Sequence, residues 1–258
     1  MIHIWCEDSN ESVTVKLWQF LCNTIGSKKF DFDILGTSSN HELVKLVRLI
    51  HDEKKFNSKD VYLIFIDNDY DSKEVERLVN DIDEITSKYQ NVIRVGYICI
   101  EYTLLKFEYL SNWIRPTWSK KLADRFDYIK EIVDIFCYYV DRHIDWRESD
   151  KVVEYVFNSG ILNKKNYEQL SQDDKLSMVS IENVSYLLLT DLINYRKRHF
   201  SVTKTSLGDC WTCNCCNISN EKMCNLLNDG LSSKEKAECI YYKSPLHKII
   251  KRAGEKLE

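Results

Sequence analysis

The chain has 258 residues, of which 44% are apolar, 29% charged and 12% aromatic. This composition supports a packed core and excludes an intrinsically disordered chain, and no run of eighteen apolar residues is present that would span a membrane. Seven glycines and two prolines are too few for an all-β sandwich or barrel with its many turns. Helix should therefore dominate.

The charge is unevenly distributed along the chain. Residues 1–112 contain 13 Lys and Arg against 19 Asp and Glu, whereas residues 113–258 contain 23 against 21. An acidic part next to a mildly basic part permits a cation-dependent site with an anionic substrate.

Short β-rich runs alternate with helical patterns in the first 112 residues. Strands are predicted at 2–6, 32–35, 61–66 and 92–100, and helices at 12–23, 41–51 and 72–89. The run 61–66 is continuously apolar, which is typical of a strand buried on both faces of a parallel sheet. The order βαβαβαβ predicts an open parallel sheet with helices on both faces, and ligands of such sheets bind at the carboxyl ends of the strands.

Residues 113–258 show almost entirely helical patterns. Apolar residues recur every three or four positions over 122–144, which predicts a long amphipathic helix, and 180–198 predicts a second, more buried one. Arg115 precedes a proline and marks the expected hinge. We expect an α/β protein, with a sheet domain at 1–112 followed by a mostly α-helical domain at 113–258 that carries a cysteine-rich C-terminal segment.

Acidic residues follow three of the predicted strands. They are Glu7, Asp8 and Glu11 after the first strand, Asp67, Asp69 and Asp71 after the third, and Glu101 after the fourth. The carboxyl ends of parallel strands share one edge of a sheet, so these side chains should converge. Such a cluster would repel itself, and a hard divalent cation with oxygen ligands removes that cost. The alternative is that these acids only cap the helices that follow the strands.

Three segments together resemble the Toprim nucleases. They are Ile4-Trp5-Cys6-Glu7, Leu63-Ile64-Phe65-Ile66-Asp67-Asn68-Asp69 and Cys99-Ile100-Glu101-Tyr102-Thr103-Leu104-Leu105. The resemblance covers about residues 1–112 and points to the bacterial branch that includes the overcoming-lysogeny-defect and RloB-like proteins. It implies a Toprim-like catalytic domain at 1–112.

The resemblance also implies roles for the acids. The catalytic residues would be Glu7, Asp67, Asp69 and Glu101, and the ligands of Mg²⁺ or Mn²⁺ would be Glu7, Glu11, Asp67, Asp69 and Asp71. Asp8 stands where the family usually has a glycine, which changes the expected geometry of the first loop. The family commonly has a catalytic lysine or arginine, and Lys106 is the nearest cation in sequence.

The activity implied is metal-dependent hydrolysis of phosphodiester bonds in DNA or RNA, by the toxic effector of a bacterial defence system against phage. Such effectors often act beside an ABC-type ATPase. Because the chain has no G-x-x-x-x-G-K-[ST] motif, that ATPase would be a separate polypeptide. Two alternatives remain: a receiver-like signalling module with Glu7, Asp8 and Asp67 as its pocket, which would not need Asp69, and a non-catalytic partner-binding protein.

Five cysteines lie within fifteen residues near the C-terminus: Cys210, Cys213, Cys215, Cys216 and Cys224. Four of them could hold a structural Zn²⁺, although only one C-x-x-C pair is present; buried free thiols or redox chemistry are the alternatives. Ten cysteines in a chain of this length that starts without a signal peptide indicate a reducing, cytoplasmic location.

Two basic runs are candidates for nucleic-acid contacts. They consist of Arg196, Lys197 and Arg198, and of Lys248, Lys251 and Arg252. Each would add a salt-dependent contact to a phosphate. The alternative is that they are solvated helix ends, where the helix dipole favours cations.

Overall fold

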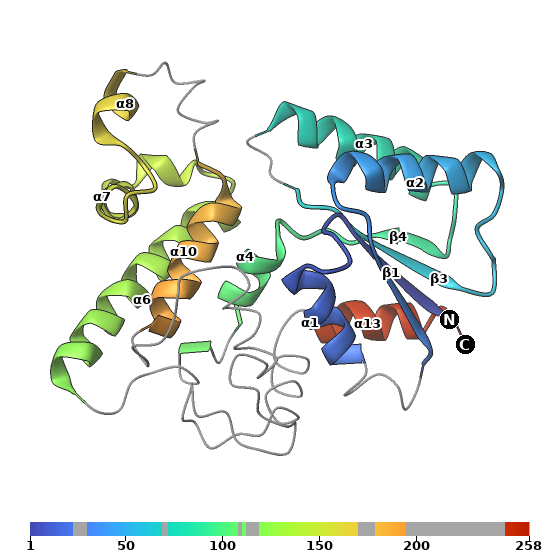
Figure 1. Cartoon of the computed structure of the whole chain (residues 1–258), viewed down its shortest axis with the longest axis horizontal. Helices are drawn as coiled ribbons and strands as arrows, with labels where there is room; N and C mark the ends of the chain where they lie inside the picture. The colour runs from blue at the N-terminus through green and yellow to red at the C-terminus, as the bar shows by residue number, and fades with distance from the viewer. Residues whose placement is uncertain are drawn as a thin grey trace.

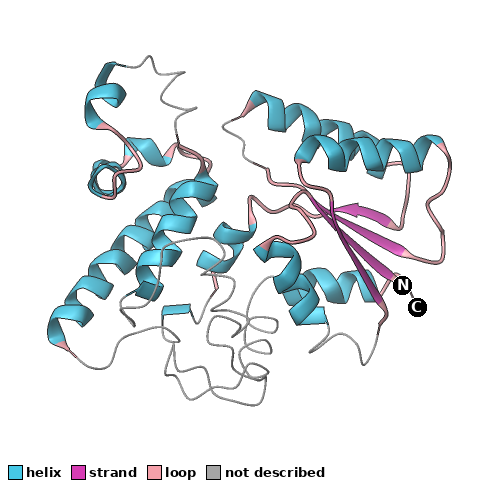
Figure 2. Cartoon of the chain, in the orientation of Figure 1, coloured by secondary structure: helices cyan, strands magenta, loops and turns pink. Residues whose placement is uncertain are grey.

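The computed structural model describes residues 1–22, 30–68, 72–107, 110–111, 119–169, 179–194 and 246–257. These residues form an α/β fold in which a parallel sheet is flanked by helices (Figures 1 and 2). The strands are β1 (Ile2–Cys6), β2 (Phe32–Gly36), β3 (Val61–Phe65) and β4 (Val92–Arg94). They pair in the order β2-β1-β3-β4, all parallel, which confirms the predicted sheet.

Helices cover both faces of this sheet. The first three are α1 (Val13–Leu21), α2 (Asn40–Asp52) and α3 (Lys73–Thr86). Each begins after a serine whose hydroxyl accepts a hydrogen bond from a backbone N–H three residues later. Figure 1 shows α2 and α3 on one face and α1 on the other, together with α13 (Leu246–Gly254).

Side chains of the central strand β3 alternate between the two faces. Leu63 and Phe65 pack in the core beneath α1 and α13, whereas Tyr62 and Ile64 pack with α2 and α3. All five β3 residues are buried, as the continuous apolar run predicted.

The rest of the described chain is helical. Its elements are α4 (Ile100–Leu105), α6 (Lys120–Asp141), a 3₁₀ turn (Trp146–Glu148), α7 (Asp150–Asn158), α8 (Lys164–Gln169) and α10 (Ile181–Asn194). In Figure 1, α4 lies between the sheet and the pair formed by α6 and α10. One hydrophobic core runs from the α1 face of the sheet through α4 to α6, α7 and α10. The Tyr102 hydroxyl donates to Asp141 Oδ1 at 2.7 Å and so joins α4 to α6.

The fourth strand differs from its prediction. It ends at Arg94, six residues before the predicted end, because the chain turns away at the exposed Gly96 and α4 then begins at Ile100. The Cys99 sulfur caps that helix by accepting from the Tyr102 N–H at 3.3 Å. Glu101 therefore lies in the first turn of a helix, and its prediction as a strand-end residue was wrong.

The end of α6 differs from its predicted pattern. α6 ends at Asp141, before the last apolar residue of its pattern, because His143 takes a left-handed backbone with φ 56°.

α13, at the end of the chain, packs Ile250 and Ala253 against the core under the sheet. Among the helices in the described ranges, none has both the length and the apolar composition needed to cross a membrane.

Candidate active site

The carboxyl ends of β1 and β3 define the centre of the sheet. The chain leaves β1 toward β2 on one side, whereas β3 leads to β4 on the other, so the loops that follow β1 and β3 diverge. Such a switch point is where open parallel sheets bind ligands. Glu7 directly follows β1, and Asp67 comes two residues after β3. The register of these two strands therefore brings together residues that are 60 positions apart.

The loop after β1 is held tightly against the end of β2. Asn10 Oδ1 accepts from the Gly36 N–H at 2.7 Å, and the Thr37 N–H donates to the Cys6 carbonyl at 2.9 Å. A Cβ on Gly36 would lie 2.4 Å from the Asp8 carbonyl oxygen, so a side chain at this position would displace the loop. These contacts set the position from which Glu7 extends.

Asp8 does not need the backbone freedom of the glycine that the Toprim pattern has at this place. Among the described non-glycine residues, a positive φ occurs at Ser38, Lys54 and His143. The Asp8 carbonyl accepts from the Ser38 N–H at 3.1 Å. The residue with a left-handed backbone in this contact is therefore Ser38, which follows β2.

Glu7 and Asp67 are hydrogen-bonded to each other. Glu7 Oε2 accepts from the Asp67 backbone N–H at 2.9 Å, and the two carboxyl groups interact directly, which raises the pKa of Asp67. The Tyr97 hydroxyl donates to Asp67 from the other side. The Asn68 N–H donates to the Ile98 carbonyl at 2.8 Å, which fastens the loop after β3 to the segment that carries Tyr97.

Burial and like charge raise the pKa values of this pair. Burial, followed by the charge of Glu7, raises the pKa of Asp67 well above its ordinary value. Burial also raises the pKa of Glu7, with contributions from Asp8 and Glu101, although hydrogen bonds from Asp67 act in the opposite direction. The pKa of the Tyr97 hydroxyl is raised by burial and by both carboxylates. A cation bound between the carboxylates would offset their like charge.

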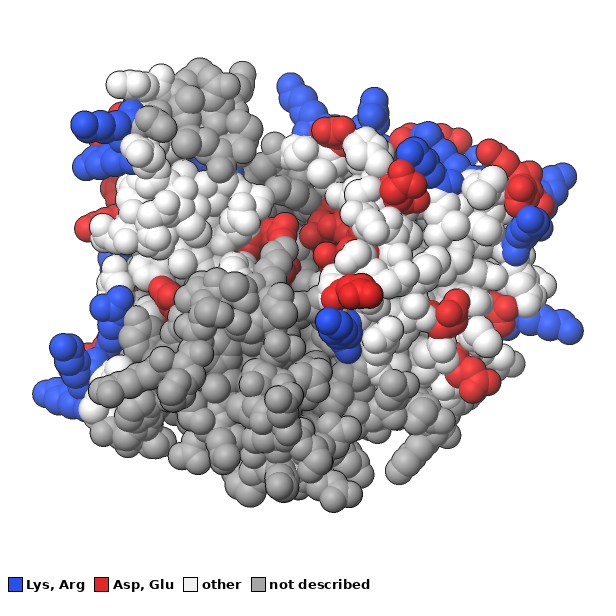
Figure 3. Space-filling model, viewed as in Figure 1, with Lys and Arg blue, Asp and Glu red and all other residues white. Residues whose placement is uncertain are grey.

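Glu101 is the third acid of the cluster. It is buried in the first turn of α4, and its charge contributes to the raised pKa values of both Glu7 and Asp67. Its charge also contributes to the raised pKa of Tyr186 on α10, so it lies between the sheet end and the helical part. Figure 3 shows acidic side chains gathered in the hollow between these two parts, with most lysines and arginines toward the periphery.

The structure joins Glu7 to Asp67 by a hydrogen bond and places Glu101 where its charge acts on both, but it does not add Glu11 to them. Glu11 is exposed in the turn before α1. Lys106 is engaged away from the cluster, because its ammonium group pairs with Asp141 and lies 5.7 Å from the centre of the Tyr102 ring.

Several predicted site residues lie outside the described residues. They are Asp69, Asp71, Arg196, Lys197, Arg198, Cys210, Cys213, Cys215, Cys216 and Cys224. Four free cysteines lie within the described part, of which Cys6, Cys22 and Cys99 are buried. Burial raises the pKa of the Cys22 thiol to about 12.

The second basic run lies on α13. Lys248, Lys251 and Arg252 are exposed on this helix, while its opposite face packs under the sheet. Lys256, just beyond the helix, donates to the Gln90 carbonyl near the amino end of β4. The C-terminal end of α13 therefore lies near the amino end of β4, whereas Glu7 and Asp67 follow the carboxyl ends of β1 and β3.

The carboxylate pair suits a hard divalent cation. In the described ranges, no three His, Cys, Asp or Glu side chains are grouped as a metal site. Mg²⁺ is commonly held by one or two carboxylates, with water and phosphate oxygens completing its octahedron. Glu7 and Asp67 meet this requirement, and their buried like charges provide the electrostatic attraction.

Sequence reasoning missed Tyr97 and the Asn10–Gly36 clamp. Tyr97 fell within the predicted fourth strand and therefore looked like a core residue. The clamp had a weak signal, because a glycine followed by Thr37, Ser38 and Ser39 is typical of a strand end with close backbone packing.

The fold and this cluster place the protein in the class of open, parallel α/β proteins with an acidic site at the switch point. Comparisons with protein-family models, with curated proteins and with solved structures find no match to the chain.

Proposed function

We propose that the protein is a Mg²⁺-dependent phosphodiesterase of the Toprim type that hydrolyses DNA or RNA. The observation that carries this proposal is the meeting of Glu7 and Asp67 at the ends of the two central strands, where the Asp67 backbone N–H donates to the Glu7 carboxylate at 2.9 Å. The resemblance of the three sequence segments to Toprim nucleases supports the same assignment. A role in bacterial defence against phage, beside a separate ABC-type ATPase, follows from that resemblance.

Each acid has a distinct role in the proposed reaction. Glu7 and Asp67 would hold Mg²⁺ or Mn²⁺, which when bound polarises the scissile phosphate and lowers the pKa of a coordinated water. Glu101, buried beside the pair, would exchange protons with the reacting groups. Tyr97 fixes the orientation of Asp67 through its hydroxyl. Asp69 would add a ligand, as the Asp-x-Asp of the Toprim pattern implies, and Asp71 is a further candidate ligand.

A receiver-like signalling module is the second candidate. It is favoured by the strand order β2-β1-β3-β4 with acids after β1 and β3, an order that flavodoxin-like receivers also have. A phosphoacceptor does not need Asp69, whereas the Toprim pattern uses both acids of the Asp-x-Asp segment. We therefore favour phosphodiester hydrolysis.

The experiment compares Asp67→Asn and Glu7→Gln with Asp52→Asn, which changes an exposed acid at the end of α2. We expect wild type and Asp52→Asn to bind Mn²⁺, detected by electron paramagnetic resonance, and to cleave labelled DNA or RNA with Mg²⁺ or Mn²⁺. Both site variants should lose Mn²⁺ binding and cleavage while their circular dichroism spectra stay unchanged. Wild-type Mn²⁺ affinity and cleavage in both site variants would refute the proposal.

A further inference from the structure

A second site is formed where α6 begins. A pocket of about 850 Å³ lies between α6, α7 and α10. Its charged lining consists of three cations, Lys120, Lys121 and Arg125 from α6, and two acids, Asp124 from α6 and Asp191 from α10, and its aromatic lining is Tyr128 from α6 and Tyr155 from α7. We call it the α6 pocket.

The α6 pocket has available positive charge. Lys120 and Lys121 are exposed, and within the described part of the chain neither of them forms an ion pair. On the pocket's inner side, Asp191 is already engaged, because it accepts a hydrogen bond from the Tyr155 hydroxyl and lies near Arg125. Figure 3 shows lysine and arginine side chains gathered over the end of α6 where the helix begins, at the lower left.

An aromatic ring lies on the same face of α6 as these cations. Lys121, Arg125 and Tyr128 are spaced four and three residues apart, so they form one stripe along the helix. At 1.5 Å rise per residue, Lys121 and Tyr128 are about 10 Å apart along the axis. The Tyr128 side chain is 47% exposed, and its ring centroid lies 6.3 Å from that of the buried Tyr155. The Tyr128 ring thus contacts Tyr155 in a tilted arrangement while part of it remains exposed.

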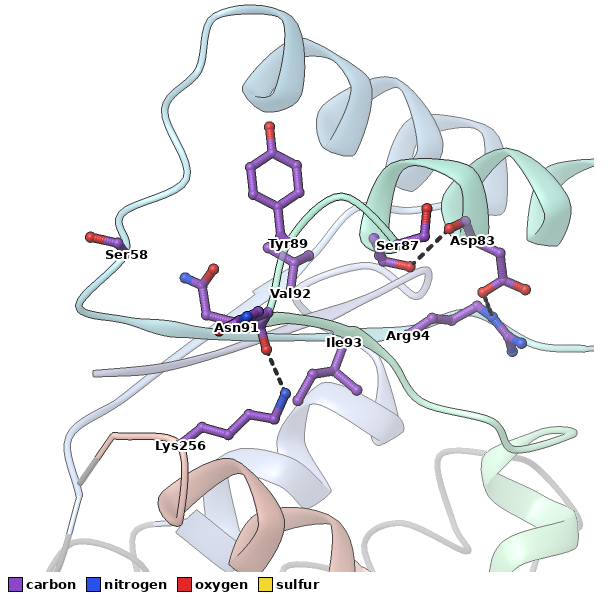
Figure 4. A pocket seen from close by; sticks show the side chains of 11 residues that line it. Ser58, Asp83, Ser87, Tyr89, Asn91, Val92, Ile93, Arg94 and Lys256 are labelled. Atoms are coloured by element: carbon purple, nitrogen blue, oxygen red, sulfur yellow. Dashed lines mark hydrogen bonds and ion pairs between the residues drawn. The ribbon is translucent and has the colours of Figure 1, made fainter.

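The pocket along the sheet edge has cations of a different kind. It has a volume of about 930 Å³ and is lined by β4, the end of α3 and Lys256 (Figure 4). There Arg94 is paired with Asp83, and Lys256 donates to the Gln90 carbonyl. Both cations have a partner within the fold, and only the buried Nη1 of Arg94 has no hydrogen-bond partner, so this pocket offers less to an anionic ligand than the α6 pocket does.

We propose that the α6 pocket binds a single nucleic-acid strand, with Lys120 and Lys121 on its phosphates and Tyr128 stacked against a base. Single-stranded nucleic acids are bound by this combination of a cationic groove and an accessible aromatic ring. That the bound strand is the substrate rests on the proposed function. It locates strand binding at the start of α6, in addition to the basic runs considered from the sequence.

The test measures binding of fluorescein-labelled ten-residue oligothymidylate and oligouridylate to the full chain by fluorescence anisotropy. EDTA is present, so that binding is separated from metal-dependent cleavage. The pocket variant is Lys120→Gln/Lys121→Gln. The control is Lys130→Gln/Lys151→Gln, which removes the same charge from α6 and α7 but at lysines paired with Asp134 and Glu131. Tyr128→Ser tests the ring separately, and thermal unfolding of each variant checks its fold.

We expect the pocket variant to bind both oligonucleotides at least tenfold more weakly and to flatten the salt slope by about 0.7 for each phosphate that is no longer neutralised. Tyr128→Ser should weaken binding by roughly fivefold or more, and the control should bind like wild type. Equal losses in pocket and control variants would overturn the inference. The inference would also be overturned if the wild type bound neither oligonucleotide, or if it bound oligoglutamate of the same charge as tightly as it binds the oligonucleotides. If Mn²⁺ binding and cleavage fail while these binding results hold, only the proposed function falls.

Discussion

Gly36→Ala tests how the end of β2 positions the loop that follows β1. The new Cβ would lie 2.4, 2.6 and 2.7 Å from main-chain atoms of residues 8, 9 and 10, all too close to be tolerated without movement. Overpacking of this kind costs about 1–3 kcal/mol, and losing the hydrogen bond from Gly36 to Asn10 adds about 1 kcal/mol. We therefore expect the free energy of unfolding to fall by about 2–4 kcal/mol.

Urea unfolding and thermal unfolding, both followed by circular dichroism, measure this loss. A chain of this length should lose roughly 2–4 °C of Tm per kcal/mol. The matched control is Gly96→Ala, because nothing lies within 4 Å of a Cβ built there. It should be neutral or stabilising by up to about 1 kcal/mol. Because the loop carries Glu7, Gly36→Ala should also weaken Mn²⁺ binding. Equal stability and equal Mn²⁺ affinity in the two variants would refute the reasoning.

Three further changes have defined outcomes. In metal-free buffer, Asp67→Asn should be more stable than wild type, and the difference should grow as the pH rises above about 4. The reason is that the raised pKa of Asp67 lets the folded wild type retain a proton that the unfolded chain releases. A pH-independent difference in urea midpoints would contradict this. Phe136→Ala, in the buried face of α6, should lose about 3–5 kcal/mol of unfolding free energy, whereas Tyr138→Ala on the exposed face should lose less than about 1 kcal/mol. Tyr102→Phe should cost about 1–2 kcal/mol by removing the hydrogen bond from α4 to Asp141, and unchanged urea unfolding would contradict that.

The acidic cluster lowers the stability of the fold, and the proposed metal would offset that effect. A carboxyl pair with raised pKa values lowers the stability of the metal-free fold as the pH rises, because burial penalises the charged form. Groups with pKa values raised by burial and like charge are common at functional sites. In this protein, the sheet and the clamp at Gly36 hold Glu7 next to Asp67 despite that penalty.

Local sequence pattern determined the order of the elements and the type of sheet. The continuous apolar run at β3 and the serine caps before α1, α2 and α3 act within a few residues, so they can be read without knowledge of the fold. The acids after β1 and β3 could also be predicted as neighbours, because the ends of parallel strands share an edge.

Tertiary packing decided which side chains complete the site. The apolar run 92–100 fits a strand or a turn followed by a helix. In the structure it is a turn capped by Cys99, followed by α4, which carries Glu101 and packs against α10. Sequence also could not separate Lys106, which pairs with Asp141, from Lys120 and Lys121, which line a pocket. Periodicity records which face of an element is buried, whereas the partner of a charged side chain depends on elements that approach from distant parts of the chain.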